Sequence, residues 1–275
     1  MDRSLKSPAV SPGSPAEPAR APAGSGSGPG AASQESPPPA AIHLRPTAPL
    51  AERVLLPGDP GRALALAQTL LQEPRMFNHH RGLWGYTGAA KDGRPLTIQA
   101  TGMGGPSAAI VLTELIALGA RRAIRVGTCG ALDRSLGLGD LLIAREAICA
   151  DGTSRALGGG ECARADCVLA DALQRSLPGA RSGTVASVDL FYEPPGHDAA
   201  GAGRLSAQLS TQALAVEMEA ATIFTIGARA GVGVGCVLAV SDTFASDGSR
   251  RRIDDGELLD PVELMGAAAV AALAG

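Results

Sequence analysis

Residues 214–242 decide the fold, and they read LAVEMEAATIFTIGARAGVGVGCVLAVSD. Their pattern predicts a short strand at 214–218, a helix of small residues at 219–230 and a buried strand at 232–240. The second strand is almost continuously apolar, which is typical of a strand covered on both faces of its sheet. A strand, a helix and a second strand in this order indicate an α/β protein.

The same alternation continues on both sides of this stretch. A buried strand at 53–57 leads into a helix pattern with apolar positions between Leu64 and Leu71. The other predicted elements are, in chain order, a hairpin over 84–100 that turns at Asp92-Gly93, a helix at 106–119, a strand at 123–126, a strand at 138–149, a helix at 165–177, a strand at 182–188 and a final helix at 257–274. We therefore predict one α/β domain over residues 42–275, with a mixed, mostly parallel central sheet flanked by helices.

Residues 1–41 differ from the rest of the chain in composition. The first forty residues contain 9 of the chain's 20 prolines, interleaved with Ser, Gly and Ala, and they have no periodic apolar face. Such a segment cannot bury enough apolar surface to offset the entropy lost on ordering. We expect it to be a disordered tail, and nothing in it indicates chemistry.

Composition excludes several classes of function. The net charge of −3 gives no basic field for nucleic acid or a membrane surface, and 3% aromatic residues leave few platforms for stacking bases. The five cysteines lack metal-ligand spacing, so we expect free thiols in a reducing compartment and no metal site. No apolar run resembles a signal peptide or a membrane span, and we expect a cytoplasmic protein.

Three glycine-rich turns follow predicted strands, where open α/β sheets place their ligands. They are PGDPGR at 57–62, TGMGGPS at 101–107 and RVGTCGA at 125–131. Glycines let backbone N–H groups approach an anion, and arginine adds a permanent charge, so Arg62, Arg125 and Thr128 could enclose phosphate. Each loop could equally be only a tight turn, and none matches a P-loop or a complete GxGxxG. Arg125 is the strongest of these clues, because a charge at the end of a buried strand needs a partner.

Carboxylates follow two other predicted strands. Glu217 and Glu219 could bind ribose hydroxyls, or they could be solvated charges at the start of a helix, where the dipole favours acids. Asp242 follows Ser241 at the end of the most apolar strand. Partial burial would raise its pKa and let it donate a proton near neutral pH, unless it only caps the next segment. Taken alone, these residues indicate an anion-binding α/β enzyme.

Seven blocks of the sequence, in order, match a more specific pattern. They are AERVLLPGDPGRA, HRGLWGYTG, TGMGGPSAAI, RVGTCGA, VASVDLFY, AVEMEAA and LAVSDTF, within residues 42–244. They resemble the blocks of the hexameric, bacterial-type purine nucleoside phosphorylases, whose superfamily includes uridine phosphorylases and nucleosidases. The resemblance implies phosphate-dependent cleavage of purine nucleosides to free base and ribose 1-phosphate. It also implies phosphate as a co-substrate, no metal or organic cofactor, and a homo-oligomer, a hexamer built from dimers with shared active sites.

Carried over position by position, the resemblance implies a role for each site residue. Those at the phosphate would be Gly58, Arg62, Arg125 and Thr128, with Arg81 from a neighbouring subunit. Those at the ribose would be Met103, Met218 and Glu219, with His43 reaching the 5′-hydroxyl across a subunit boundary. Those at the base would be Phe191 and Val216 on its two faces, Glu217 at the pocket edge, and Ser241 with Asp242, the acid that protonates purine N7.

Two segments depart from the family pattern. Family members commonly place an arginine after the aspartate to assist it, but here three arginines occur together at 250–252 and the spacing differs. The segment at 193–205, EPPGHDAAGAGRL, is unusually rich in glycine, so closure over the base is expected to differ.

Three alternatives stay open at this stage. A uridine phosphorylase would carry a Gln and an Arg shortly after Phe191-Tyr192, and both are missing here. A nucleosidase would use water and would not need the arginine cluster, whereas a non-catalytic nucleoside-binding protein would not need Asp242. An aspartate at 242 also predicts activity on both 6-amino and 6-oxo purine nucleosides, since a carboxyl group can donate or accept. The sequence leaves open the preferred purine, the preference for ribose or deoxyribose and the exact oligomer.

Overall fold

The computed structural model describes residues 41–192, 209, 211–244 and 249–275. The expected tail at 1–41, apart from Ala41, and the glycine-rich segment at 193–205 lie outside these residues. The described residues belong to a compact unit that runs from Pro38 to Gly275.

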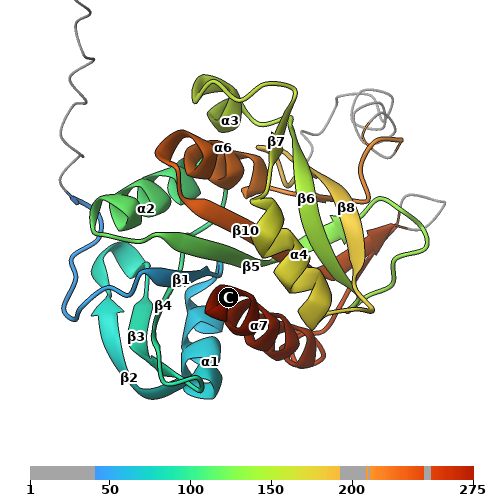
Figure 1. The fold of residues 1–275 in the computed structure, drawn as a ribbon. Helices are drawn as coiled ribbons and strands as arrows, with labels where there is room; N and C mark the ends of the chain where they lie inside the picture. The colour runs from blue at the N-terminus through green and yellow to red at the C-terminus, as the bar shows by residue number, and fades with distance from the viewer. Residues whose placement is uncertain (1–40, 193–208, 210, 245–248) are drawn as a thin grey trace, which may run out of the picture. The chain divides into compact units, whose positions relative to one another are not determined.

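Four mutually parallel strands form the centre of the sheet (Figure 1). In spatial order they are β4 (Pro95–Gln99), β1 (Arg53–Leu56), β5 (Arg122–Ala131) and β10 (Gly233–Phe244). Their side chains are almost entirely buried on both faces, which explains why the sequence of β10 is apolar without alternation. The prediction of an α/β fold with a mixed sheet flanked by helices is confirmed.

The sheet also closes on itself, which the sequence did not predict. β10 pairs antiparallel with β6 (Leu141–Cys149), and β6 pairs parallel with β8 (Arg181–Ser187). β8 also pairs parallel with β9 (Ala215–Glu217), and β9 pairs antiparallel with β5. Because β5 already pairs with β10, these five strands complete a ring. Closure brings the ends of β9, β5 and β10 to one place, with Gly130 opposite both Val216 and Asp242.

The remaining strands lie at the margins of the sheet. β3 (Gly85–Ala90) pairs antiparallel with β4, so the predicted hairpin is confirmed. β2 (Leu71–Asn78) was not predicted, since Leu71 continues the apolar pattern of the preceding helix but begins a strand instead. The short strands β7 (Cys162–Arg164) and β11 (Arg250–Arg252) were also missed, because three residues carry too little pattern.

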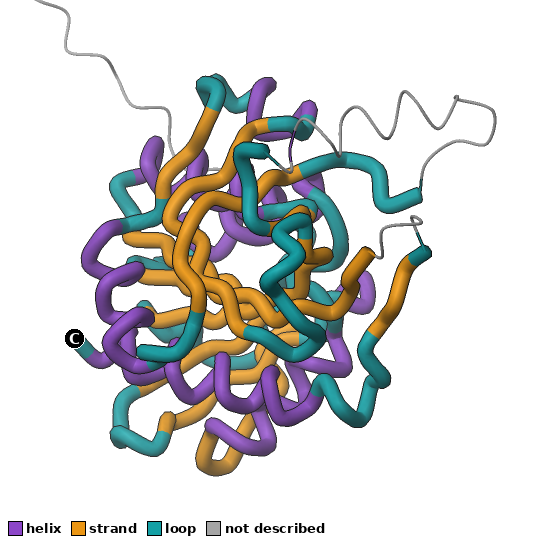
Figure 2. Tube along the Cα trace, turned by 90° about the vertical axis from the view of Figure 1, so that its right-hand side faces the viewer, coloured by secondary structure: helices purple, strands orange, loops and turns teal. Residues whose placement is uncertain are grey.

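Helices cover the sheet in two groups, and Figure 2 shows them outside the strands. One group contains α2 (Gly105–Ala117), α3 (Gly152–Ala156) and α6 (Ala220–Ala230), and α2 and α6 pack over one core cluster. The other contains α1 (Pro60–Leu70), α4 (Cys167–Ser176) and α7 (Leu259–Ala274), over a second cluster. Asp59 caps α1 by accepting from the Arg62 backbone N–H at 2.8 Å, which sets Arg62 in the first turn.

None of the helices in the part of the chain that the structure describes has both the length and the apolar character of a membrane span.

Candidate active site

The three glycine-rich loops meet where parallel strands end. The backbone N–H of Thr101 donates to Pro57 O at 2.9 Å, and that of Gly102 donates to Gly58 O at 3.0 Å, so the first two loops are joined. The third loop lies within β5, which pairs with β1 on one side and β10 on the other. Neighbouring parallel strands end at the same edge, and this edge carries the predicted phosphate residues.

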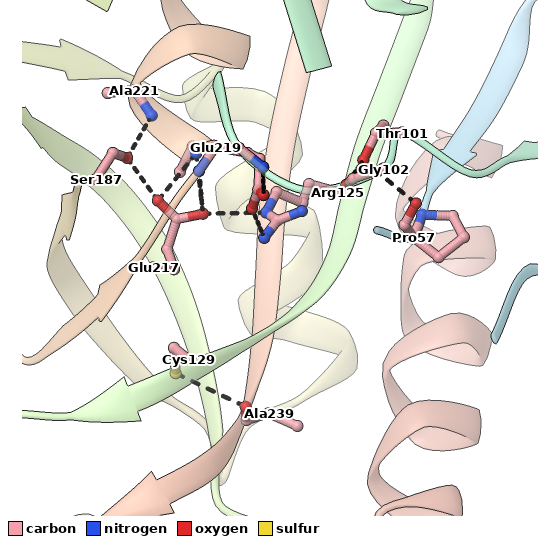
Figure 3. A network of polar contacts seen from close by, with 12 residues as sticks. Pro57, Thr101, Gly102, Arg125, Cys129, Ser187, Glu217, Glu219, Ala221 and Ala239 are labelled. Atoms are coloured by element: carbon pink, nitrogen blue, oxygen red, sulfur yellow. Dashed lines mark hydrogen bonds and ion pairs between the residues drawn. The ribbon is translucent and has the colours of Figure 1, made fainter. Parts of the chain in front are cut away.

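Arg125 is the centre of a buried polar network (Figure 3). Its Nε donates to Glu217 Oε2 at 3.1 Å and its Nη2 donates to Glu219, whereas the buried Nη1 has no partner among the described residues. A Cβ at Gly127 would lie 2.8 Å from Arg125 Cζ, so only glycine leaves room for the guanidinium. Burial opposes the charge, but Glu219 and Glu217 outweigh it and raise the pKa of Arg125. The guanidinium is therefore permanently charged, and its Nη1 is left without a partner among the described residues.

Glu217 accepts a hydrogen bond from Arg125 and is itself held in place by a side chain and by backbone N–H groups. The Ser187 hydroxyl donates to Glu217, and the backbone N–H groups of Glu219 and Ala220 donate to it at 2.9 and 3.0 Å. Ser187 in turn accepts from the backbone N–H of Ala221 at 2.8 Å. Burial and the charge of Glu219 raise the pKa of Glu217, against the influence of Arg125. Its two oxygens are thus occupied by protein groups, in contrast to the expected position at the pocket edge.

Glu219 joins Arg125 to the second glycine-rich loop. It begins α6 and accepts from the backbone N–H of Gly104, which has a φ of 84° that glycine adopts readily. Met103, the residue before Gly104, is 86% exposed, and Met218 is half-buried. The two residues predicted to lie at the ribose therefore flank a carboxylate whose position is fixed by the backbone.

A second arginine faces the same region as Arg125. Arg62 is half-buried, and its buried Nη1 also has no partner in the described parts of the chain. Burial and the positive charge of Arg125 lower the pKa of Arg62. A Cβ on Gly58 would lie 3.9 Å from Arg62 Nη2, which places that glycine beside the guanidinium. Two neighbouring cations with unused donors form a site suited to an anion.

Asp242 lies in a separate cluster at the end of β10. Ser241 Oγ donates to its Oδ2 at 2.7 Å, Arg250 Nε donates to Oδ1 at 2.7 Å, and Arg252 Nη1 lies 3.2 and 3.3 Å from the two oxygens. Our expectation of a raised pKa is wrong. Burial acts to raise the pKa of Asp242, but the bonds from Arg250 and Ser241 and the charges of both arginines lower it below its ordinary value. Asp242 also caps no helix, because it lies within a strand.

Aromatic and aliphatic side chains surround this second cluster. The Phe191 ring is half-exposed, and the Arg250 Cζ lies 4.3 Å from its centroid. A Cβ on Gly130 would meet the Phe244 ring at 3.3 Å and Val216 Cγ1 at 3.4 Å. The predicted base-binding residues Phe191 and Val216 thus lie around Asp242, together with Phe244, which we did not predict.

The two residues predicted to serve a neighbouring subunit lie apart from these clusters. His43 Nδ1 is 2.7 Å from Glu114 Oε1, and Glu114 also accepts from the backbone N–H groups of residues 42–44. His80 Nδ1 lies 3.0 Å from His43 O, next to Arg81, which is exposed at a φ of +59°. Arg81 makes no hydrogen bond or ion pair within the described ranges, so its guanidinium is available to another molecule.

Sequence reasoning assigned no role to two side chains of the site. Ser187 lies in the block VASVDLFY and Phe244 in the block LAVSDTF, so both belong to motifs that we recognised, but we predicted no role for either residue. Thr128, by contrast, was predicted and is half-buried at the third loop, and its hydroxyl has no hydrogen bond to the described residues. No group of three or more His, Cys, Asp or Glu side chains in the described ranges is arranged to hold a metal ion.

The structure has an α/β fold with a cluster of arginines and carboxylates at the ends of its parallel strands. Comparison with known proteins agrees, since the family described as the Phosphorylase superfamily matches residues 52–274. The chain belongs to this superfamily and is related to nucleoside phosphorylases within it.

The individual relatives are purine and uridine phosphorylases. A "Purine nucleoside phosphorylase DeoD-type" of Clostridium novyi (strain NT) is 36% identical over 205 residues, covering 72% of this chain and 84% of the relative. The protein of the same description from Oceanobacillus iheyensis is 37% identical over 200 residues, covering 70% and 83%. The crystal structure of uridine phosphorylase from Vibrio fischeri ES114 matches with a TM-score of 0.72 at 25% identity, covering 82% of this chain and 92% of that one. The resemblance drawn from the seven blocks is confirmed.

Proposed function

We propose that this protein cleaves the N-glycosidic bond of purine ribonucleosides and deoxyribonucleosides reversibly with phosphate. The products are the free base and (deoxy)ribose 1-phosphate. The observation that carries the proposal is the pair Arg62 and Arg125, each with a buried Nη1 that has no partner among the described residues, beside the carboxylate of Glu219. A phosphate dianion supplies oxygens for both donors and relieves the repulsion between the two cations.

The two clusters suit the two charges of the reaction. Glycosidic cleavage passes through an oxocarbenium-like sugar, with positive charge on the ribose and negative charge on the leaving base. Phosphate held by Arg62 and Arg125 attacks C1′, while the electron pair of the C1′–N9 bond moves into the purine. Glu219 accepts from the 2′- and 3′-hydroxyls, and Asp242 donates a proton to N7.

The lowered pKa of Asp242 adds a condition to this scheme. Arg250, Ser241 and Arg252 hold Asp242 as a carboxylate at neutral pH. For Asp242 to act as an acid, its proton must arrive with the nucleoside, when contact with the base replaces an arginine bond. We expect the pKa of Asp242 to rise on nucleoside binding.

We further propose that two subunits share each site, in a hexamer built from dimers, with His43 and Arg81 serving the neighbour. The exposed guanidinium of Arg81 beside His43 supports this arrangement. Mixing tests it: Arg81→Ala damages the neighbour's site and Asp242→Asn its own. Co-assembly of the two inactive variants should restore roughly a quarter of the sites, because half of randomly paired dimers are mixed and each has one intact site. No recovery after verified subunit exchange would contradict sharing. The free cysteines favour the cytoplasm as the compartment.

A uridine phosphorylase is the second candidate, because a solved uridine phosphorylase shares this fold at 25% identity. The purine reading is favoured by the higher identity to purine nucleoside phosphorylases.

Base release from inosine, adenosine, guanosine and uridine, each with and without phosphate, tests the proposal. We expect phosphate-dependent release from the purine nucleosides, with both 6-amino and 6-oxo substrates cleaved. Uridine cleavage alone would select the second candidate, and release without phosphate would indicate a nucleosidase. A protein that binds nucleosides without cleaving any, and whose binding is unchanged by Asp242→Asn, would be a non-catalytic binding protein.

A further inference from the structure

Arg250 contacts two residues that the proposed reaction needs for the purine. Its Nε donates to Asp242 Oδ1 at 2.7 Å, and its Cζ lies 4.3 Å from the centre of the Phe191 ring. A guanidinium at this distance from an aromatic face makes a cation–π contact. A planar cation therefore lies over the Phe191 ring while it hydrogen-bonds to the carboxylate of Asp242.

The strand register explains why Arg250 and Arg252 both contact Asp242 and Arg251 does not. β11 pairs antiparallel with β10, and Arg252 lies opposite Asp242, Arg251 opposite Thr243 and Arg250 opposite Phe244. Successive side chains of a strand point to opposite faces, so the first and third arginines lie on the face of Asp242. Arg251 makes no ion pair or side-chain hydrogen bond within the described residues.

A purine bound as proposed needs the same two contacts. It stacks on Phe191, and its N7 meets the carboxyl group of Asp242. Arg250 and the base cannot occupy one position, since both are planar groups that cover the same ring and meet the same carboxyl group. Arg252 approaches Asp242 from the directly opposite strand position, and among the described arginines it is Arg250 that lies over the Phe191 ring.

We propose that Arg250 holds the place of the purine base in the empty enzyme and must leave it when the base binds, while Arg252 stays on Asp242. This inference rests on the proposed function for the identity of the ligand. The surroundings favour exchange: the Arg250 side chain is 31% exposed, its strand has three residues and lies at the sheet edge, and Phe191 is 49% exposed. Such a side chain can turn to solvent at little cost.

The consequence is measurable as binding. When only a fraction of the protein has an open base position, the apparent Kd is the intrinsic Kd divided by that fraction. Removal of Arg250 leaves the position open. We therefore expect Arg250→Ala to bind a free purine base, hypoxanthine or adenine, about 5–30-fold more tightly than the wild type, or about 1–2 kcal/mol.

Calorimetric titration of the full-length protein with hypoxanthine and adenine provides the test, with Arg251→Ala as the matched control on the same strand. The control should bind like the wild type. Arg250→Lys, which keeps the charge but loses the planar group, should fall between the wild type and Arg250→Ala and serves if the alanine variant is unstable. Arg252→Ala should gain no affinity for the base.

Three results would overturn the inference. Arg250→Ala could bind the base more weakly, as expected if Arg250 contacts the bound purine; it could match Arg251→Ala; or no variant could bind a purine base. Binding needs no turnover, so the two proposals can fail separately. Tighter binding by Arg250→Ala in a protein that cleaves no nucleoside would reject the proposed reaction alone. An active enzyme without tighter binding would reject the place-holding role of Arg250 alone.

Discussion

The Arg125 cluster and the Asp242 cluster both join arginine to carboxylate, but they are built differently. Arg125, Glu217 and Glu219 are all buried, and each carboxylate is also bound by backbone N–H groups. Asp242 is buried as well, but its arginine partners are 31% and 54% exposed and come from a short edge strand. The first cluster is part of the core, whereas the second is a buried acid reached by surface side chains.

The difference follows from what each cluster would bind. In the proposed reaction, phosphate and the pentose are common to all nucleoside substrates, so a rigid site can be built for them from central strands. Removing one partner from a buried ion pair is costly, and the network around Arg125 holds both carboxylates in place. The base site must admit and release a planar group, and exposed arginines can exchange partners with solvent.

Replacing Arg125 should produce the largest effect and would test whether the first cluster is part of the core. Arg125→Ala leaves Glu217 and Glu219 buried without their cation, so we expect about 3–5 kcal/mol lower stability. We expect kcat/KM to fall on the order of 10³-fold or more, since a hydrogen-bond donor to the phosphate is lost. Chemical denaturation and steady-state phosphorolysis measure these effects. Arg53→Ala, which removes another buried arginine of the same sheet and breaks its ion pair with the exposed Asp92, is the control and should cost stability without changing the KM for phosphate. Equal phosphate KM values for the two variants would remove Arg125 from the phosphate site.

Replacing Asp242 should affect activity strongly and stability weakly, which would sharpen the contrast. Asp242→Asn removes the proton donor, and we expect kcat to fall by about 10²–10⁴-fold. Stability should change by less than about 1 kcal/mol, because the arginines that lose their partner can be solvated. A stability loss as large as that of Arg125→Ala would show that the second cluster is also a core element.

Glu114 is a buried carboxylate outside both clusters, and it tests how much such a group contributes to stability. Burial acts to raise its pKa, but the backbone N–H groups of residues 42–44 and the His43 ring lower it to about 2 from 4.5. Because the folded pKa is depressed, the stabilisation is complete above pH 4.5 and is lost as the pH falls towards 2. This shift corresponds to about 3 kcal/mol at neutral pH. Glu114→Gln should lose most of it at pH 7 and little near pH 2, and pH-dependent unfolding of the two proteins measures the difference. An equal loss at both pH values would mean that the contribution is not ionic.

Ser187→Ala should have the smallest effect and would test how far the first cluster extends. It removes a donor to Glu217 and an acceptor for the Ala221 N–H, and we expect about 1–2 kcal/mol lower stability. Because Ser187 lies behind Glu217, the KM for phosphate should rise only a few-fold. Val188→Ala, at the adjacent position, is the control for loss of side-chain volume. An unchanged stability would limit the rigid cluster to Arg125 and the two glutamates.

The sequence predicted the long elements well because their patterns are local. The continuous apolar run of β10 and the Asp92-Gly93 turn of the hairpin each follow from residues close in the chain. β2 was not predicted because Leu71 fits the apolar period of the preceding helix as well as it fits the strand that it begins. The pKa of Asp242 was predicted in the wrong direction, since burial was considered without the arginines eight and ten residues further on. In a strand at 250–252, the first and third arginines lie on the same face, so their contact with Asp242 could have been predicted if this segment had been recognised as a strand.

The α/β class, the glycine-rich loops and the family follow from the amino-acid sequence without coordinates, because short motifs and their order are local features of the chain. Tertiary structure alone decided the closure of the strand ring and the partners of each charge. Closure brings Gly130, Val216 and Asp242 together from three distant segments, and no periodicity encodes such a pairing. The state of a buried charge depends on every group around it in space, which is why the partners of Glu217 and Arg250 became visible only in the folded chain.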